Sequence, residues 1–322
     1  MTRFVLGRVA QMAVTLLGAS VVVFTVLRLM PGDPALVYAG PFAGSDVVEA
    51  VRDRMGLHDP LPVQYLLWLK AFVTGDLGVS SISGLPVSQL VGSALAQTAL
   101  LTLTTSLLAI GVGVPLGLLA ALRKGTWADR LVAGFNTVAL GVPNFWLGLI
   151  LVIVFAINFS ILPAGGSAKL TEDPLGALTS LVLPTIALGL APAAMLARLT
   201  RGAVIEVMHE DFMTMAAAKG MSIGFVIRRS LLRHVFLNLL PVLAILVGSL
   251  LTGAAIIESV FTLPGAGRLI IESTRQRDYA VLQTLLVIFV AVFLLVTFVA
   301  DILYSVLDPR VRGHLMREGG VR

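Results

Sequence analysis

Six long apolar segments constrain this chain more than any other feature of its sequence. A helix needs about 20 predominantly apolar residues to cross the hydrocarbon core of a bilayer. Because backbone polar groups inside a bilayer must be satisfied within the segment, such segments fold as helices. The sequence therefore predicts an all-α integral membrane protein with six transmembrane helices. The predicted spans are Val9–Leu27, Thr98–Leu122, Leu131–Ile157, Leu175–Ala197, Val235–Ile257 and Tyr279–Ala300.

Composition supports this class. Of the 322 residues, 57% are hydrophobic and only 13% are charged, whereas soluble domains carry about 25% charged residues. The absence of cysteine excludes disulfides and thiolate metal sites, and the four histidines are too scattered to predict a metal centre. The net charge of +5 is explained by basic cytoplasmic loops rather than by nucleic acid, so no nucleic-acid partner is expected.

Arg3 and Arg8 precede the first apolar segment, in the charge order of a signal peptide. We expect a retained helix instead, because the apolar core is longer than a signal h-region and no small-x-small cleavage site follows. With the N-terminus in the cytoplasm, 15 of the 23 Lys and Arg residues fall in cytoplasmic segments. The positive-inside rule thus predicts that both termini are cytoplasmic.

The long segment 31–97 is expected on the external side and contains apolar residues at helical spacing over Val63–Val73. Tyr65 and Trp68 in this stretch are residue types typical of the bilayer interface. Two interpretations remain open for it: a short helix resting on the membrane surface, or a docking surface for an external partner.

The cytoplasmic loop between the fourth and fifth spans is the most distinctive polar stretch. Glu206 to Gly220 is predicted to form one amphipathic helix, because Ile205, Met208, Phe212 and Met215 recur on one helical face. Gly220 is a natural helix C-cap. Ser222 is placed to cap a second helix, predicted over Ile223–Arg233, and Pro241 is expected to kink the fifth span.

Small side chains at Ala216, Ala217 and Ala218, next to Gly220, permit another surface to approach this helix closely. The alternative is a helix that lies among lipid headgroups, with Arg228, Arg229 and Arg233 near anionic lipid.

Several motifs, read together, resemble the permeases of ABC importers, and in particular the first permease subunit of the dipeptide, oligopeptide and nickel family. The loop around Ala216–Gly220 is similar to the family's "EAA" signature. Thr214 stands at the position of the eponymous glutamate and Met215 at that of the first alanine. The other matching stretches are VLRLMPGDPA (Val26–Ala35), GLHDPLPVQYLLWL (Gly56–Leu69), GDLGVS (Gly75–Ser80), PNFWLGL (Pro143–Leu149), ESVFTLPGAGRLI (Glu258–Ile270) and DILYSVLDPRVR (Asp301–Arg312).

This resemblance implies a type I ABC importer permease fold with cytoplasmic coupling helices, in a bacterial inner membrane. It also implies a second homologous permease subunit, two cytoplasmic ATPase domains and an external substrate-binding protein. The chain then divides into residues 1–30 (first span), 31–97 (external segment), 98–307 (permease core, with the coupling loop at 206–234) and 308–322 (cytoplasmic tail). The implied ATPase-coupling residues are Asp211, Thr214, Met215, Ala216, Ala217, Ala218, Lys219 and Gly220.

The chain has no G-x-x-x-x-G-K-[ST] loop for cradling phosphates. No cofactor is expected in it, and ATP and Mg²⁺ would be bound by the partner ATPases. Polar residues within the spans are few and uncharged. Asn144, beside Pro143, is a candidate for a helix break that lines a translocation path, and Thr102, Asn136, Ser249 and Thr252 are further candidates. Serine and threonine in spans also bond their own helix or a neighbour, and the many glycines favour close helix packing.

The leading interpretation is a non-catalytic permease subunit of an ATP-driven importer for peptides or a related small solute. An independent secondary transporter or channel would be expected to show intramembrane charge or an inverted repeat, and neither is evident. A membrane scaffold without a path is the third alternative. The sequence leaves the cargo open among a dipeptide, a longer peptide, glutathione and a nickel chelate.

Overall fold

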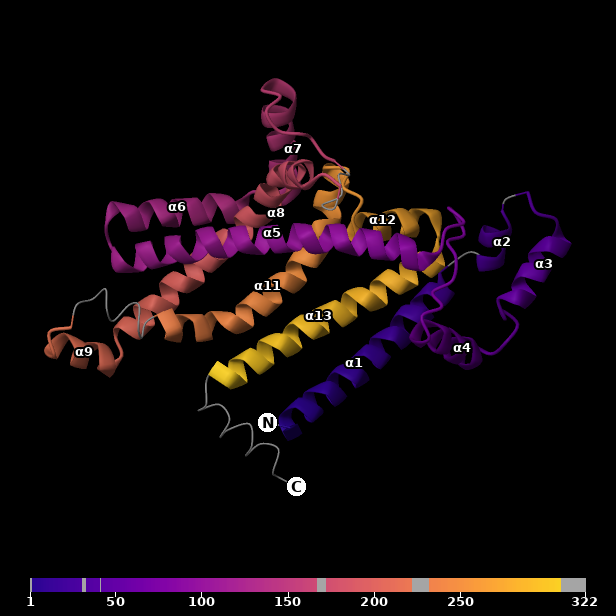
Figure 1. The fold of residues 1–322 in the computed structure, drawn as a ribbon, viewed down its shortest axis with the longest axis horizontal. Helices are drawn as coiled ribbons and strands as arrows, with labels where there is room; N and C mark the ends of the chain where they lie inside the picture. The colour runs from indigo at the N-terminus through magenta and orange to yellow at the C-terminus, as the bar shows by residue number, and fades with distance from the viewer. Residues whose placement is uncertain (1, 31–32, 41, 167–171, 222–231, 308–322) are drawn as a thin grey trace. The chain divides into compact units, whose positions relative to one another are not determined.

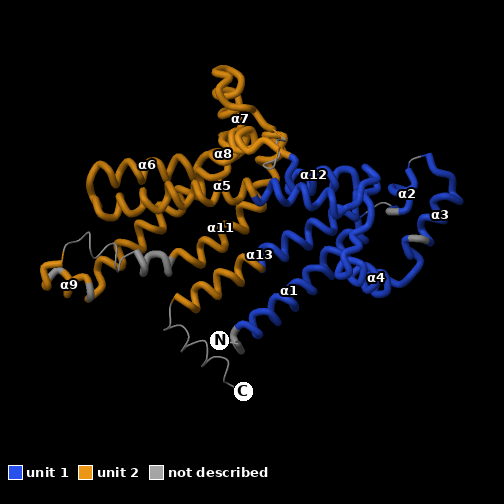
Figure 2. Tube along the Cα trace, in the orientation of Figure 1, with its two compact units in different colours: residues 1–99, 264–294 blue, residues 100–263, 295–322 orange. Residues whose placement is uncertain are grey.

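The computed structural model describes residues 2–30, 33–40, 42–166, 172–221 and 232–307, and the regular elements within these ranges are helices (Figure 1). Five helices are long and apolar enough to cross a membrane, and a bent helix pair makes up to six. The predicted all-α membrane architecture is therefore confirmed. The chain forms two compact units, residues 1–99 with 264–294 and residues 100–263 with 295–322 (Figure 2).

The first unit contains α1 (Thr2–Leu29), α2 (Pro34–Ala39), α3 (Ser45–Arg54), α4 (Leu61–Val73), α12 (Ala266–Gln276) and the first parts of α5 (Val87–Leu122) and α13 (Tyr279–Leu307). Its buried core consists of Val87, Val91, Ala94, Ala266, Val281 and Leu285. The Ala266 N–H donates a 2.8 Å hydrogen bond to Thr98 Oγ1. Asp33 caps the start of α2 and pairs with Arg52, which ties α2 to α3.

The helix predicted over Val63–Val73 is present as α4, which has Pro62 in its first turn, where a missing N–H costs nothing. Its aromatic residues pack on α1. The Phe24 ring lies 5.5 Å from that of Tyr65 and 5.9 Å from that of Trp68. Tyr65 Oη is also 2.8 Å from Ser20 Oγ. Helix α4 therefore packs against α1 through these aromatic side chains. Leu66 and Leu67 of α4 are exposed, and both interpretations of this exposed surface remain open.

The second unit is organised around α8 (Pro174–Met208), which contacts α6 (Trp127–Gly141), α7 (Asn144–Leu151) and α11 (Leu232–Val260). Within its most apolar window, 67% of α8 is buried inside the chain, against 11% for α13. Large buried side chains of this core include Leu181, Leu188, Leu196, Leu250, Ile257 and Phe261. Since α8 is enclosed by protein, a movement of α8 is transmitted to several neighbouring helices.

Helices α5 and α8 approach each other through glycine and alanine. A Cβ on Gly113 would lie 2.4 Å from the Ala193 carbonyl oxygen, and a Cβ on Gly117 would lie 2.4 Å from that of Ala197. The two contacts are four residues apart on each helix and advance in the same direction, so α5 and α8 run parallel, with small residues at the contact. The predicted packing role of glycines is thus confirmed at Gly113 and Gly117, whereas a Cβ on Gly111 meets nothing within 4 Å in this chain.

The third predicted span, Leu131–Ile157, is present as a bent helix pair rather than as one continuous helix. Helix α6 ends at Gly141, α7 begins at Asn144, and the two axes are bent by 97° (Figure 1). The cause is local. Val142 is extended, with φ −91° and ψ 123°, as expected before proline, and Pro143 has no N–H to continue the α6 ladder. Helix α7 continues into a π-helix, η1 (Val152–Asn158).

Candidate functional site

Helix α8 is much longer than a membrane crossing requires. Its 35 residues extend about 52 Å at 1.5 Å per residue, against a hydrocarbon core of about 30 Å. The predicted span Leu175–Ala197 therefore corresponds only to the first part of α8. Because its C-terminal part carries Arg198, Arg201 and Glu206, we expect that part to project about 20 Å beyond the hydrocarbon core.

A separate short helix, α9 (Asp211–Ala218), follows this projecting end. The prediction of one helix from Glu206 to Gly220 is wrong, because α8 ends at Met208. The hydrogen bonds of a new helix begin where the Met213 N–H donates to the Glu210 carbonyl at 2.9 Å. The chain therefore turns at His209 and Glu210.

The apolar face that was predicted to run along this segment is divided by the same turn. Ile205 and Met208 pack beside the buried Val204 of α8, whereas Met215 is 58% exposed. The Phe212 side chain, the fourth member of the predicted face, lies outside the described residues.

Gly220 ends α9 in the conformation predicted from the sequence. Its φ is +68°, and the Met221 N–H donates a 3.1 Å hydrogen bond to the Ala216 carbonyl, which is the six-to-one bond of a Schellman cap. A Cβ built on Gly220 meets nothing within 4 Å. Within this chain, glycine is therefore required by backbone conformation rather than by space. The predicted second helix over Ile223–Arg233, with its Ser222 cap, lies outside the described residues except for its last two positions at the start of α11.

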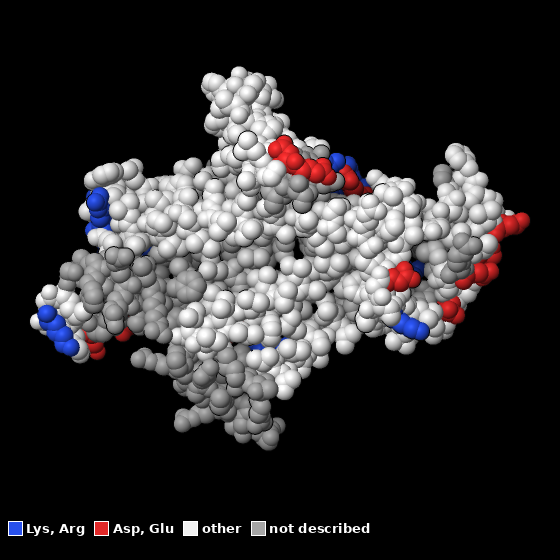
Figure 3. Space-filling view, viewed as in Figure 1, with Lys and Arg blue, Asp and Glu red and all other residues white. Residues whose placement is uncertain are grey.

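The surface of α9 is open. Asp211, Thr214, Met215, Ala218, Lys219 and Gly220 are exposed and Ala216 is half-buried, while the Ala217 side chain lies outside the described residues. Met215 and Met221, the latter 41% exposed, add flexible apolar side chains of the kind used at adaptable protein contacts. In the space-filling view, Lys and Arg appear at α9 and at the link between α5 and α6 (Figure 3).

An ion pair that the sequence analysis missed connects that link to α8. Arg201 Nε and Nη2 donate to the two carboxylate oxygens of Asp129 at 2.7 and 2.8 Å, and the Gly125 N–H donates to the same carboxylate at 3.0 Å. Such a two-point contact fixes geometry as well as charge. Its partners are 72 residues apart, so the sequence carries no local signal for it.

We predict that Asp129→Asn and Arg201→Gln each lower the midpoint of thermal unfolding and reduce transport. Each removes one partner of a bidentate pair and leaves the other uncompensated. A double-mutant cycle measured by thermal unfolding should give non-additive effects, and Arg198→Gln, at an exposed arginine on the same helix, should change little. Strictly additive losses at positions 129 and 201 would contradict an interaction between them.

The five candidate path residues lie on four helices, and no hydrogen bond described in the structure joins any two of them. Asn144 is the first residue of α7, directly after the 97° bend, so the predicted break there is confirmed. Thr102 and Asn136 are buried, and Thr102 Oγ1 and Asn136 Oδ1 have no hydrogen-bond partner among the described residues. Ser249 and Thr252 are exposed and donate to carbonyls of their own helix. A role in lining a path stays a prediction for all five.

Comparisons with known proteins agree with this architecture. The family described as "Binding-protein-dependent transport system inner membrane component" matches residues 113–313, and the corresponding N-terminal family matches residues 1–95. The chain is 37% identical to the probable peptide ABC transporter permease protein y4tP of Sinorhizobium fredii, over 96% of this chain and 99% of that protein. It is 35% identical to the glutathione transport system permease protein GsiC of Escherichia coli, over 97% of this chain and 99% of that protein.

The fold is similar to crystal structures of the MetNI methionine ABC transporter in inward-facing conformations. One of them gives a TM-score of 0.56 at 18% identity and covers 69% of this chain and 98% of that chain. A second gives a TM-score of 0.57 at 19% identity. The chain thus has the type I ABC importer permease fold, and it belongs to the family of inner membrane components of binding-protein-dependent transport systems.

Proposed function

We propose that this chain is one of two homologous permease subunits of an ATP-driven importer, and that α9 with Gly220 is where a partner ATPase docks. In this proposal the chain performs no catalysis. The partner ATPases bind ATP and Mg²⁺, and an external binding protein delivers the solute. The observation that carries the proposal is the exposed surface of α9, which follows a helix longer than a membrane crossing requires.

The packing of α8 supports a mechanical role for this surface. A displacement of α9 moves the end of α8, whose buried face contacts α6, α7 and α11 and whose small residues lie against α5. Closely packed interiors move as units rather than deform. Closure of the ATPases on ATP would therefore rotate these helices together and alternate the access of a central path between the two sides.

The same packing supports the orientation that we propose for the chain. Because α5 and α8 are parallel, the α5–α6 link and the projecting end of α8 lie on one side of the membrane. This side carries Arg123, Lys124, Arg201 and Lys219, which supports a cytoplasmic location for it and for both termini. The division into residues 1–30, 31–97, 98–307 and 308–322 remains part of the proposal.

Peptides are the cargo that we propose, in keeping with the peptide and glutathione transport named for the relatives. The candidate path residues are uncharged, so the path is expected to bind its solute weakly and the external protein to select it. Purification from the native membrane in mild detergent should recover an ATPase, a second permease and an external binding protein, whose bound ligand identifies the cargo. Recovery of this chain alone, under conditions that preserve other ABC complexes, would contradict the proposal.

A bulky side chain on α9 gives a direct test of docking. We expect Ala218→Trp to leave membrane insertion and thermal unfolding unchanged, because Ala218 is exposed, and to lower uptake at least about tenfold by blocking close approach of the ATPase. Ala133→Trp, at an exposed alanine of α6, is the matched control and should retain uptake. The readouts are co-purification of the ATPase and uptake of a labelled dipeptide. Normal co-purification and uptake with Ala218→Trp would rule out docking at this face.

A further inference from the structure

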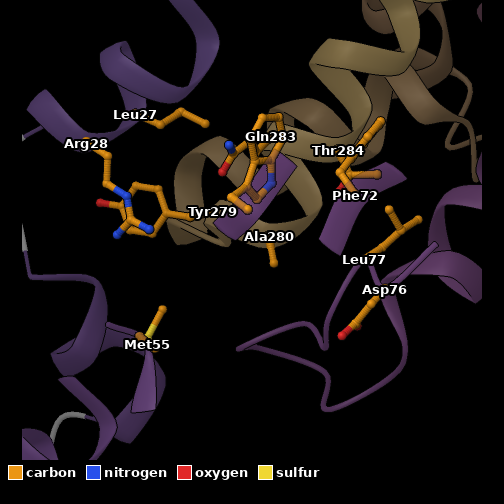
Figure 4. Close-up of a pocket in the computed structure, with 11 residues that line it drawn as sticks. Leu27, Arg28, Met55, Phe72, Asp76, Leu77, Tyr279, Ala280, Gln283 and Thr284 are labelled. Carbon is orange, nitrogen blue, oxygen red and sulfur yellow. The ribbon is translucent and has the colours of Figure 1, made fainter. Parts of the chain in front are cut away.

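The first unit holds a cavity of about 160 Å³ that the transport function leaves unexplained. It is formed where α1 ends, α4 ends and α13 begins (Figure 4). Its walls are mostly apolar, with a few polar groups that converge on it. The lining residues that matter for its chemistry are Arg28, Trp68, Phe72, Asp76, Tyr279 and Gln283.

One wall of the cavity carries two buried hydrogen-bond donors without a described partner, together with a guanidinium group. Gln283 is only 7% exposed, and its Nε2 and the Tyr279 Oη are buried with no hydrogen-bond partner among the described residues. The guanidinium of Arg28 lies 5.3 Å from the Phe24 ring centre, and no described carboxylate forms an ion pair with it. Buried donors are normally satisfied. An oxyanion, which accepts several hydrogen bonds and carries negative charge, satisfies all three.

A second wall carries the opposite charge. Asp76 lines the cavity and accepts a 3.2 Å hydrogen bond from the Gly78 N–H through Oδ1, which leaves Oδ2 for a ligand. Figure 4 shows Asp76 across the view from Arg28 and Tyr279. A ligand with one negative and one positive group therefore matches the cavity better than a simple anion.

The position of the cavity identifies the source of such a ligand. Arg28 is in the last turn of α1 and Tyr279 is the first residue of α13, so both lie at the depth of the lipid headgroups. Tryptophan and tyrosine are typical of this level, and an arginine placed there can form charge-assisted hydrogen bonds with a lipid phosphate. The apolar Val22, Val26 and Leu29 are exposed along the adjoining part of α1, where acyl chains would lie.

The size of the cavity also favours a headgroup over a whole solute. Sites for small molecules usually measure about 300–1,000 Å³, whereas a cavity of about 150 Å³ holds a group the size of benzene. We propose that this cavity binds the headgroup of an aminophospholipid, with its phosphate at Arg28, Tyr279 and Gln283 and its ammonium group at Asp76. The inference requires only that the chain spans a membrane, so it stands or fails independently of the cargo and of the docking of an ATPase.

Lipid binding to the full-length chain tests this proposal. The purified protein is titrated with phosphatidylethanolamine or phosphatidylglycerol in detergent, and bound lipid is counted by native mass spectrometry. We expect wild type to retain phosphatidylethanolamine, Arg28→Gln to lose at least about tenfold in affinity, and Lys70→Gln, at an exposed basic residue of α4, to bind as wild type does. Asp76→Asn should remove the preference for phosphatidylethanolamine over phosphatidylglycerol without removing binding.

Thermal unfolding of each variant separates lost binding from lost folding. If Arg28→Gln does not fold, Gln283→Leu replaces it, since exchanging an unpaired amide for an apolar group of similar size removes a donor at little cost to stability. Equal binding of phosphatidylethanolamine by wild type and the folded variant would overturn the proposal. Displacement of the lipid by millimolar inorganic phosphate or a soluble dipeptide would also overturn it, by showing that the site takes a soluble ligand.

Discussion

Gly117→Leu is expected to abolish the folded protein in the membrane. Even the Cβ of an alanine at this position would lie 2.4 Å from the Ala197 carbonyl oxygen and 2.6 Å from the Thr200 Cβ, where the obstructing atoms belong to a packed helix. Overpacking a core costs about 1–3 kcal/mol and more when backbone must move. We therefore expect Gly117→Ala to cost at least the upper part of this range, because the Ala197 carbonyl belongs to the backbone. Gly117→Leu should exceed it, against a total stability of about 5–15 kcal/mol.

Gly111 provides the matched control, because it lies on the same helix α5 and a Cβ there meets nothing within 4 Å. Gly111→Ala should leave stability unchanged or raise it by up to about 1 kcal/mol, since alanine is the better helix former. The measurement is the yield and thermal midpoint of monodisperse protein by fluorescence-detected size-exclusion chromatography. Equal yields for Gly117→Leu and Gly111→Leu would show that the close contact of α5 with α8 does not limit folding.

Gly220→Val is expected to uncouple ATP hydrolysis from uptake while leaving the membrane core folded. A left-handed conformation costs roughly 1–2 kcal/mol for residues with a Cβ and more for a β-branched one. Valine at φ +68° is therefore expected to break the capping hydrogen bond from Met221 to Ala216 and to unwind the last turn of α9. Because 1.4 kcal/mol is a factor of ten, we expect uptake to fall at least about tenfold. Thermal unfolding of the membrane core should be nearly unchanged, since the strain is confined to the end of α9, whose surface is exposed.

Gly220→Asn separates backbone conformation from steric exclusion by a partner. Asparagine tolerates the left-handed region but is larger than glycine. If conformation alone matters, Gly220→Asn retains most of the uptake that Gly220→Val loses. If the partner ATPase must approach Gly220 closely, both variants lose uptake and the ATPase no longer co-purifies. Full coupling in Gly220→Val would show that the cap of α9 has no part in transport.

Features that depend on neighbours in the sequence were predictable from it. The apolar runs identify the spans, because a helix in a bilayer satisfies its own backbone and its length follows from membrane thickness. The end of a helix at Gly220 was also predictable. The left-handed conformation depends on a single residue, and the hydrogen bond that closes the cap joins residues only five positions apart in the chain. The helix break at Asn144 was foreseen because Pro143 precedes it, although its 97° angle was not.

Features that depend on distant residues were decided only by the tertiary structure. Whether the chain continues as a helix past Ala197 is not fixed by periodicity. Packing of Val204 and Val207 against Leu239 extends α8 to Met208, and this divides the predicted amphipathic helix.

The ion pair of Asp129 with Arg201 and the donors of Arg28, Tyr279 and Gln283 at one cavity likewise unite residues far apart in the chain. The sequence by itself therefore determined the membrane class and the ends of local elements, because these depend on hydrophobicity and single-residue conformation. Which side chains meet was decided by helix packing, where steric fit between remote glycines, alanines and charged groups sets the outcome.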